Sequence, residues 1–373
     1  MILQQLSLTN YKNIEATTLS FSNKLNCIIG SNGMGKTNLL DSIYYLSFAR
    51  TCVYLPDHMV VRNGAEMAIL DGKYKIGDKD EHLYCGIRIG KSKVFRRNKK
   101  EYTKISDHIG AFPLVMISPA DFELIRGGSE ERRKFMDMII SQESSPYLLA
   151  LISYRKLLEQ RNSMLKKRNF STELLDIIDE QMAPHAETIM RYRSQWLDRI
   201  RPIFHEYYNY ISDNSDDVSL VYHSSLETEE IAGAATFLRI WKETRERDIA
   251  LGHTSMGPHR DDLDMLLNGV LIRKIGSQGQ NKTFMVALKF AQFRLLRILQ
   301  PHNMPLLLLD DVFDKLDAHR VDRIVRLVSG EEFGQIFMSD TNRKYLDQIL
   351  SRLPEATYSI FTAQDGVFTE IKP

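Results

Sequence analysis

The chain has 373 residues, of which 26% are charged and 43% are apolar, and its net charge is +1. This composition is ordinary for a soluble globular protein and excludes an intrinsically disordered chain, and the length predicts two or three domains. Because the net charge is close to zero, no global basic field attracts nucleic acid, so any such contact must come from a local patch.

The cysteines and the first residues indicate the compartment. Cys27, Cys52 and Cys85 have no metal-ligand spacing and are predicted to be reduced thiols, with Cys27 in an apolar strand. The opening MILQQLSLTNYKN lacks the basic start and apolar stretch of a signal peptide, and no apolar run approaches the ~18 residues of a membrane span. We therefore expect a cytosolic protein.

The first motif with a chemical meaning is GSNGMGKT, which stands between the apolar run LNCII and the helical pattern NLLDSIYYLSF. Its spacing is that of a P-loop, in which glycine N–H groups surround phosphate, the lysine reaches the terminal phosphates and the hydroxyl holds Mg²⁺. The N-terminus of the following helix also favours an anion. The predicted nucleotide contacts in this stretch are Gly30, Ser31, Asn32, Gly33, Met34, Gly35, Lys36, Thr37 and Asn38, with Thr37 also a metal ligand.

Residues 66–118 are predicted to form an antiparallel sheet. Their short apolar runs (AILDGKY, LYCGIRIG, KVFRR and PLVMIS) are separated by Gly and Asp. Within them, KSKVFRRNKKEYTK (residues 91–104) carries seven basic side chains against one Glu, with Phe95 and Tyr102 interleaved. Such a density suits phosphate contacts, although a solvated hairpin explains it equally well. The candidate DNA contacts are Lys91, Lys93, Arg96, Arg97, Lys99 and Lys100.

After Pro119 the pattern changes to long amphipathic helices that run to about Ile211, and Pro184 is expected to kink or break them. We interpret their apolar stripes as helix-on-helix core rather than a cofactor site. The cluster Lys166-Lys167-Arg168 is interpreted as a solvated helix end. Further on, GPHRDD (residues 257–262) is interpreted as a buried polar network that supports the helix after it, with no nucleophile nearby in the sequence.

The stretch SQGQ opens a helix over residues 277–299, and this helix leads into the strand PLLLLDD (residues 305–311). Four consecutive leucines indicate a buried parallel strand that delivers Asp310 and Asp311 to the carboxyl edge of a sheet. Asp310 is predicted to hold Mg²⁺ and Asp311 to orient or deprotonate an attacking water. Because Asp310 is so far along the chain from Lys36, a large insertion must separate two strands of one nucleotide-binding sheet.

A serine and a glycine at a helix N-terminus offer a hydroxyl and free N–H groups to an anion, although SQGQ alone could be a plain helix cap. Its place before an acidic strand resembles that of the signature motif of ABC-type ATPases. In that family the motif completes the nucleotide site of a second subunit. The resemblance implies an ATP-dependent homodimer, with Ser277, Gly279 and Gln280 contacting the partner's nucleotide and Asp317, in FDKLD, at the D-loop position.

Over nearly its whole length the sequence resembles the bacterial RecF family of recombination and repair proteins. The matching blocks include LNCIIGSNGMGKTNLLDSIYYLSFART, SPADFELIRGGSEERRKFMD, GPHRDDLDMLLNG, SQGQNKTFMVALKFAQ and LLLLDDVFDKLD. The resemblance implies a weak ATPase that acts as a clamp on gapped or single-strand/double-strand junction DNA. It also implies recombinase loading with the mediators RecO and RecR, and roles at replication forks and in the SOS response.

Several positions depart from the ATPase families. Lys12 stands where the RecF family commonly has an arginine near the nucleotide, and Asp121 replaces the Q-loop glutamine, where we expect it to contact the metal. Thr341 or Asp340 occupies the place of a transporter's switch histidine, and Asp311 replaces the longer Glu. The shorter Asp311 and the missing histidine predict slow hydrolysis, with Lys36, Ser277 and Asp311 as the catalytic residues and ATP as a timer.

The predicted fold class is α/β: an ABC-type ATPase head with a P-loop and a mixed-sheet lobe, and an inserted, mostly helical second lobe. We expect residues 1–120 and 301–373 in the first lobe and residues 121–300 in the second. The main alternative is another ABC-type chromosome-maintenance or nuclease-associated ATPase. Three further interpretations remain open: a transporter ATPase subunit, disfavoured by the missing glutamine and histidine; a P-loop nuclease or kinase with a metal at GPHRDD; and a DNA-binding protein with a vestigial P-loop.

Overall fold

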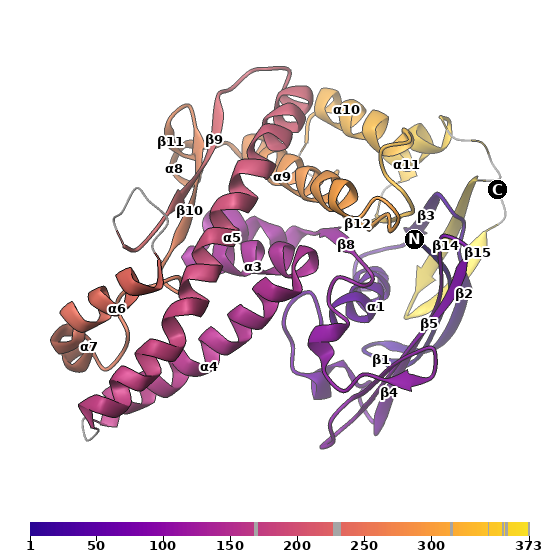
Figure 1. Cartoon of the computed structure of the whole chain (residues 1–373). Helices are drawn as coiled ribbons and strands as arrows, with labels where there is room; N and C mark the ends of the chain where they lie inside the picture. The colour runs from indigo at the N-terminus through magenta and orange to yellow at the C-terminus, as the bar shows by residue number, and fades with distance from the viewer. Residues whose placement is uncertain are drawn as a thin grey trace. The chain divides into compact units, whose positions relative to one another are not determined.

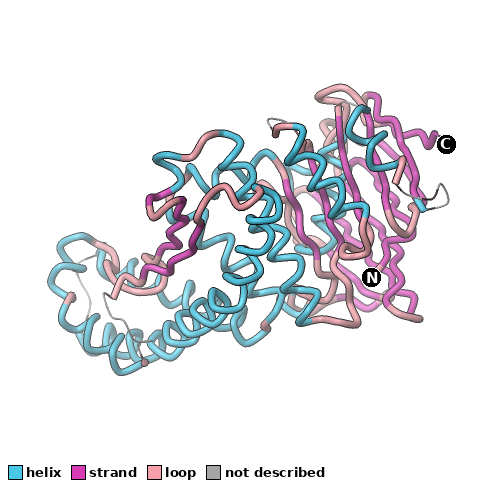
Figure 2. The backbone as a smooth tube through the Cα atoms, turned by 90° about the horizontal axis from the view of Figure 1, so that it is seen from above, coloured by secondary structure: helices cyan, strands magenta, loops and turns pink. Residues whose placement is uncertain are grey.

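The computed structural model describes residues 1–167, 171–226, 233–313, 316–341, 343–352, 354 and 357–371. The chain forms two compact units (Figure 1). Strands gather mainly in the first unit and helices dominate the second, as Figure 2 shows. Unit 1 comprises Met1–Asp121, Tyr207–Asn214 and Gln278–Pro373, and unit 2 comprises Phe122–Glu206 and Ser215–Ser277.

Unit 1 contains a six-stranded, mostly parallel sheet with the strand order β15-β14-β3-β13-β12-β8. Only β15 is antiparallel to its neighbour. All residues of β8, β12 and β13 are buried, because both faces of a parallel sheet are covered. The strands are β3 (Leu25–Ile29), β8 (Leu114–Ile117), β12 (Leu306–Asp310), β13 (Ile336–Asp340), β14 (Tyr358–Gln364) and β15 (Val367–Ile371).

The predicted antiparallel sheet is the second sheet of unit 1, with the order β2-β1-β4-β5-β6-β7. The prediction was wrong for PLVMIS, because β8 pairs in parallel with β12 in the first sheet. Its four consecutive buried residues are the pattern of a parallel strand, whereas β4 alternates between buried and more exposed positions. The strands are β1 (Ile2–Tyr11), β2 (Ile14–Ser20), β4 (Met67–Ile76), β5 (Lys79–Arg88), β6 (Val94–Arg97) and β7 (Lys100–Glu101).

Helices connect and cover these sheets. Helix α1 packs against strands of both sheets, which explains why nearly all its side chains are buried. Helix α9 packs against β8, so the structure groups it with unit 1 and not with the inserted lobe that the sequence predicted. The helices of unit 1 are α1 (Lys36–Phe48), α9 (Gln278–Leu299), α10 (Ala318–Ser329) and α11 (Arg343–Leu350), with 3₁₀ turns η1 (Asp57–Val60), η2 (Ile105–Asp107) and η3 (Pro119–Phe122).

Unit 2 consists of helices and a three-stranded antiparallel sheet, β11-β10-β9. The sequence predicted a kink or break at Pro184; the break does not occur, because α5 continues through both Pro184 and Pro202, and its last residues belong to unit 1. The elements are α2 (Glu123–Arg126), α3 (Ser129–Glu143), α4 (Ser145–Lys167), α5 (Thr172–Ser212), β9 (Val218–His223), α6 (Ala234–Glu243), α7 (Arg245–Leu251), β10 (Asp262–Leu267), β11 (Val270–Leu271) and α8 (Ile272–Ile275).

Two sequence predictions concern the chain as a whole. All three cysteines are free; Cys27 and Cys85 are buried and Cys52 is partly so, and burial raises the pKa of each thiol. In the part of the chain that the structure describes, no helix is long and apolar enough to span a membrane. In the cluster at the end of α4, Arg168 lies outside the described residues, as do Asp314 and Lys315 of the FDKLD segment.

Candidate nucleotide-binding site

The P-loop follows β3 and leads directly into α1. Gly33 and Gly35 have φ of +82° and +100°, conformations that glycine adopts without steric cost. The buried Lys36 folds back over the loop, and its Nζ donates to the carbonyl oxygens of Gly30 and Ser31 at 2.7 and 3.0 Å. The predicted strand, loop and helix are therefore present in the predicted order.

Two turns outside the motif hold the P-loop in place. The β1–β2 turn supplies Asn13, whose Oδ1 accepts a hydrogen bond from Asn38 Nδ2 at 2.8 Å and whose amide lies against Gly35. The β14–β15 turn supplies Gly366, whose N–H donates to the Met34 carbonyl at 3.0 Å. Sequence reasoning missed both residues, although the pair Asp365-Gly366 carries a hairpin-turn signal.

The acidic strand β12 ends beside the P-loop. Thr37 Oγ1 donates to Asp310 Oδ2 at 2.8 Å, and the hydroxyl of Ser339, at the end of the neighbouring β13, donates to the other carboxylate oxygen. Burial raises the pKa of the Asp310 carboxyl, and these two hydrogen bonds act in the opposite direction. The structure thus brings together Thr37 and Asp310, which the sequence proposed as metal ligands, and adds Ser339.

These oxygen donors fit a Mg²⁺ ion. A hydroxyl and a carboxylate are hard ligands, and Mg²⁺ commonly takes only one or two protein ligands and completes its shell with phosphate and water. Among the described residues no group of three or more His, Cys, Asp or Glu side chains forms a metal cluster. A metal at Thr37 and Asp310 would therefore depend on the nucleotide for further ligands.

Asp121, the third predicted metal ligand, has other partners in the structure. Its Oδ1 pairs with Lys289 Nζ at 2.6 Å, and its Oδ2 accepts the backbone N–H of Ser118 at 2.7 Å. Lys289 is buried in the middle of α9 and also donates to the Met116 carbonyl at 2.9 Å. Asp121 therefore joins the end of β8 to α9, and the structure gives it a lysine where the sequence predicted a metal.

Lys12 also has a protein partner. Its Nζ lies 2.6 Å from Asp41 Oδ2 of α1, an oxygen that also accepts the Tyr11 hydroxyl at 2.6 Å. Asp41 is fully buried, and its other oxygen accepts the N–H of Cys52 at 2.7 Å. The lysine predicted to contact nucleotide therefore anchors the β1–β2 turn to the helix that follows the P-loop.

The signature-like residues lie at the start of α9. Ser277 immediately precedes the helix, and Gly279 and Gln280 are in its first turn. A Cβ atom at Gly279 would lie 2.7 Å from Arg320 Nη1, so the guanidinium of Arg320 covers this glycine. Arg320 belongs to α10, whose N-cap is Asp317, the residue at the D-loop position.

Asp311 follows β12 in a left-handed conformation, with φ of +47°. Its N–H donates to the Ser339 carbonyl at 3.3 Å, and its own carbonyl accepts Lys282 Nζ of α9 at 3.3 Å. The segment that carries the predicted water-orienting carboxylate is thus fixed to β13 on one side and to α9 on the other.

The six predicted DNA contacts divide into two groups. Arg97 forms a bidentate pair with Glu81 at 2.7 and 2.8 Å, and Lys93 Nζ donates to the Ala49 carbonyl and pairs with Asp57 at 3.1 Å. Phe95 is core. The prediction therefore needs correction for Arg97, which joins β6 to β5, and for Lys93, which precedes β6 and joins it to the end of α1 and to η1. The cations that remain exposed are Lys91, Arg96, Lys99 and Lys100.

The GPHRDD segment of unit 2 belongs to a polar network, as predicted. His259 Nδ1 and the Tyr154 hydroxyl are 2.7 Å apart, and Asp262 pairs with Arg132 at 2.6 Å. Burial lowers the pKa of His259 to about 4, so this histidine is neutral at pH 7. Its proposed support of the signature helix stays a prediction.

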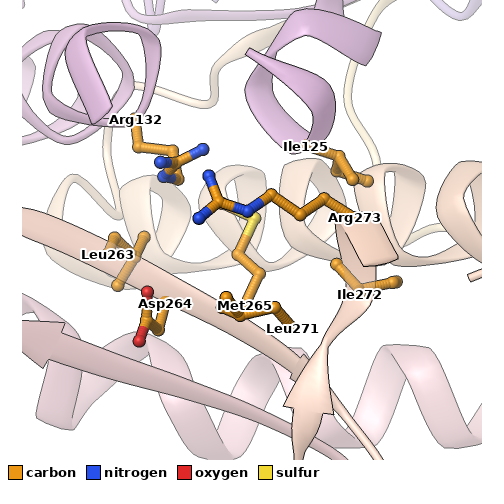
Figure 3. Close-up of a pocket in the computed structure, with 8 residues that line it drawn as sticks. All are labelled: Ile125, Arg132, Leu263, Asp264, Met265, Leu271, Ile272 and Arg273. Atoms are coloured by element: carbon orange, nitrogen blue, oxygen red, sulfur yellow. The ribbon is translucent and has the colours of Figure 1, made fainter. Parts of the chain in front are cut away.

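A pocket in unit 2 lies beside this network (Figure 3). Apolar side chains of β10, β11 and α8 form its floor, and Arg273 reaches across it toward Arg132. Its volume of about 10 Å³ is enough for about one water molecule, so it is not a second nucleotide site. Its lining is Ile125, Arg132, Leu263, Asp264, Met265, Leu271, Ile272 and Arg273.

Comparison with known proteins agrees with this geometry. The family model of the RecF/RecN/SMC N terminal domain matches residues 2–369. The DNA replication and repair protein RecF of Parabacteroides distasonis is 48% identical over 373 residues, covering 100% of this chain and 99% of the relative. That of Porphyromonas gingivalis is 50% identical over 368 residues, covering 98% and 99%.

Solved structures extend the comparison to the fold. The recombination mediator protein RecF with ATP, in the RecFOR pathway, superposes with a TM-score of 0.89 at 28% identity, covering 99% of this chain and 97% of that chain. The Smc head domain of Pyrococcus furiosus has a TM-score of 0.59 at 17% identity, covering 99% and 96%, and supports the predicted ATPase-head fold alone. The P-loop, the acidic strand and these relatives together place the chain in the RecF family of DNA replication and repair proteins.

Proposed function

We propose that the chain is an ATP-dependent DNA clamp of recombinational repair that dimerises when it binds ATP. The observation that carries the proposal is the hydrogen bond between Thr37 and Asp310, which joins the P-loop to the acidic strand in one phosphate and metal site. The RecFOR pathway named for the solved relative supports RecO and RecR as partners. Gapped or single-strand/double-strand junction DNA is part of the same proposal. Roles at replication forks and in the SOS response belong to the same proposal.

Different residues have different proposed roles in ATP binding. The loop N–H groups and Lys36 bind the phosphates, and Thr37 and Asp310 would hold Mg²⁺. When bound, Mg²⁺ neutralises charge on the phosphate oxygens. Asn13 and Gly366 keep the loop in the shape that the phosphates require. We also propose a cytoplasmic localisation, because the proposed ligands are ATP and DNA and the proposed partners are RecO and RecR.

Hydrolysis is proposed to be slow. Asp311 is the residue that would orient water, and its side chain is shorter than the glutamate of faster ATPases. No histidine follows β13, where Asp340 ends the strand and Thr341 comes next. The long-lived ATP state then acts as a timer for the clamp.

The proposed dimer explains the signature residues. Ser277, Gly279 and Gln280 are at a helix N-terminus, where N–H groups and the helix dipole attract an anion. We propose that this anion is the terminal phosphate of the ATP held by a second copy of the chain. One chain alone then has no complete site, so dimerisation and ATP binding depend on each other.

The proposed DNA surface is the exposed part of the β6–β7 hairpin and its flanks. Reversing Arg96, Lys99 and Lys100 to Glu should weaken binding to all DNA sequences alike, because phosphate contacts carry no sequence information. Losing three phosphate contacts should also reduce the slope of log affinity against log salt by about 2.7, at about 0.9 per contact. A variant with an unchanged salt slope would remove this hairpin from the DNA surface.

Fluorescence anisotropy with a labelled gapped duplex tests the function directly. We expect tight binding with ATP and weak binding with ADP, with no nucleotide, or for Lys36→Met. Degradation of the DNA by the protein in the presence of Mg²⁺ and without ATP would indicate a nuclease instead. Equal binding by Lys36→Met and the unaltered protein would indicate a DNA-binding protein with a vestigial P-loop.

A further inference from the structure

Arg320 connects two motifs that lie far apart in the sequence. Its Nη1 lies 2.7 Å from the position of a Cβ atom at Gly279, and among the described residues, apart from the chain neighbours of Gly279 and the backbone of α9 itself, Arg320 is the only one with an atom within 4 Å of that position. Its side chain is only 18% exposed. The guanidinium therefore lies directly on the first turn of α9, and a Cβ atom at Gly279 would displace it.

The same arginine is held from the other side by Asp317. The Asp317 carboxylate accepts the backbone N–H of Arg320 at 2.9 Å and pairs with its guanidinium at 3.4 Å. Asp317 thus caps α10 and also sets the direction of the arginine side chain. Gly279, Arg320 and Asp317 form one contact chain from the signature turn to the D-loop position.

A positive charge at this place is unfavourable for the protein by itself. The N-terminus of a helix carries the positive end of the helix dipole, so a cation there costs free energy. The cost is removed when an anion binds the same turn, because the guanidinium and the N–H groups then attract it together. The position of Arg320 therefore favours a helix start that meets an anion in its working state.

A second contact joins α9 to the residue that follows β12. Lys282, one turn beyond Gly279, is buried and donates to the Asp311 carbonyl at 3.3 Å. Asp311, which follows β12, and Arg320 of α10 thus both contact α9.

We propose that Arg320 is a positioning residue for the clamp: it holds the signature turn and the D-loop aspartate as one unit that meets the partner's nucleotide. This inference rests on the proposed ATP-dependent dimer and adds the residue that aligns its two contact motifs. Arg320 acts through its contacts with Gly279 and Asp317. It is not required for ATP to bind the P-loop of the same chain.

The test compares dimerisation with ATP affinity of the monomer. Arg320→Ala should weaken the ATP-dependent dimer about tenfold, measured by sedimentation, leave the monomer's ATP affinity unchanged, and leave its melting temperature unchanged or slightly higher. Arg320→Lys should restore part of the dimer affinity, because lysine can pair with Asp317 but cannot lie flat on Gly279. The matched control is Arg326→Ala, which removes an exposed arginine of the same helix that pairs with Asp322 at 2.7 Å.

A double-mutant cycle tests the contact itself. Gly279→Ala should displace the guanidinium and weaken the dimer about tenfold, and Gly279→Ala combined with Arg320→Ala should be no weaker than Arg320→Ala alone. Additive losses, or an Arg320→Ala dimer as strong as that of Arg326→Ala, would overturn the inference. Ser277→Arg distinguishes an error in this inference from an error in the proposed function. If Ser277→Arg dimerises normally with ATP, the proposed shared-site dimer is wrong.

Discussion

Replacing Gly366 with alanine tests whether the β14–β15 turn holds the P-loop. Gly366 has φ of +80°, where a side chain costs about 1 kcal/mol. The added Cβ would lie 3.1 Å from the carbonyl carbon of Asn13 and closer still to its oxygen. Because Asn13 hydrogen-bonds Asn38 and Gly366 hydrogen-bonds Met34, relieving this overlap must move the loop.

We expect Gly366→Ala to lower the free energy of unfolding by about 2–4 kcal/mol, the sum of the backbone cost and of a severe overlap with backbone atoms of Asn13. ATP affinity should fall about tenfold, which corresponds to about 1.4 kcal/mol. Urea unfolding gives the first quantity and titration with a fluorescent ATP analogue gives the second.

Gly64→Ala is the matched control, because Gly64 has φ of +83° and, among the described residues other than its chain neighbours, no atom lies within 4 Å of its Cβ position. It carries the same backbone cost without the overlap, so its ATP affinity should equal that of the unaltered protein. If Gly366→Ala binds ATP as tightly as Gly64→Ala, the β14–β15 turn does not hold the P-loop and the reasoning is refuted.

Two further predictions concern buried carboxylates. Burial raises the pKa of Asp310, so the charged carboxylate lowers stability above that pKa. Asp310→Asn should therefore keep or raise the melting temperature at pH 8, but Mg²⁺–ATP should no longer raise it. An Asp310→Asn variant that Mg²⁺–ATP still stabilises would contradict the metal site. Burial raises the pKa of Glu143 from 4.5 to about 7, so stability falls as pH rises through this range. In urea unfolding, the free energy of unfolding of Glu143→Gln relative to that of the unaltered protein should increase by about 2 kcal/mol from pH 5 to pH 8. Parallel pH profiles of the two proteins would refute this.

The nucleotide site could be predicted because its pattern is local. The P-loop spacing requires neighbouring glycines and a lysine at the start of a helix, and Asp310 follows an uninterrupted apolar strand. Asn13, Ser339 and Gly366 could not be found in this way. Each reaches the site from a distant turn or strand, and only the folded sheet order brings them together.

The errors also have physical causes. PLVMIS was assigned by its neighbours in sequence, although its unbroken apolar run is that of a buried parallel strand. Pro184 does not interrupt α5, because tertiary packing outweighs the loss of one backbone hydrogen bond. A count of basic residues gives no direction for their side chains, so Lys93 and Arg97 could not be separated from the exposed cations.

The central claim is that ATP closes a site shared by two chains, and sedimentation of the purified protein tests it most directly. The measurement is made with no nucleotide, with ADP and with ATP, beside Lys36→Met and Ser277→Arg. We expect ATP alone to convert monomer to dimer and both substitutions to prevent it. A protein that keeps the same mass in all three conditions, or a Ser277→Arg variant that still dimerises with ATP, would contradict the shared site.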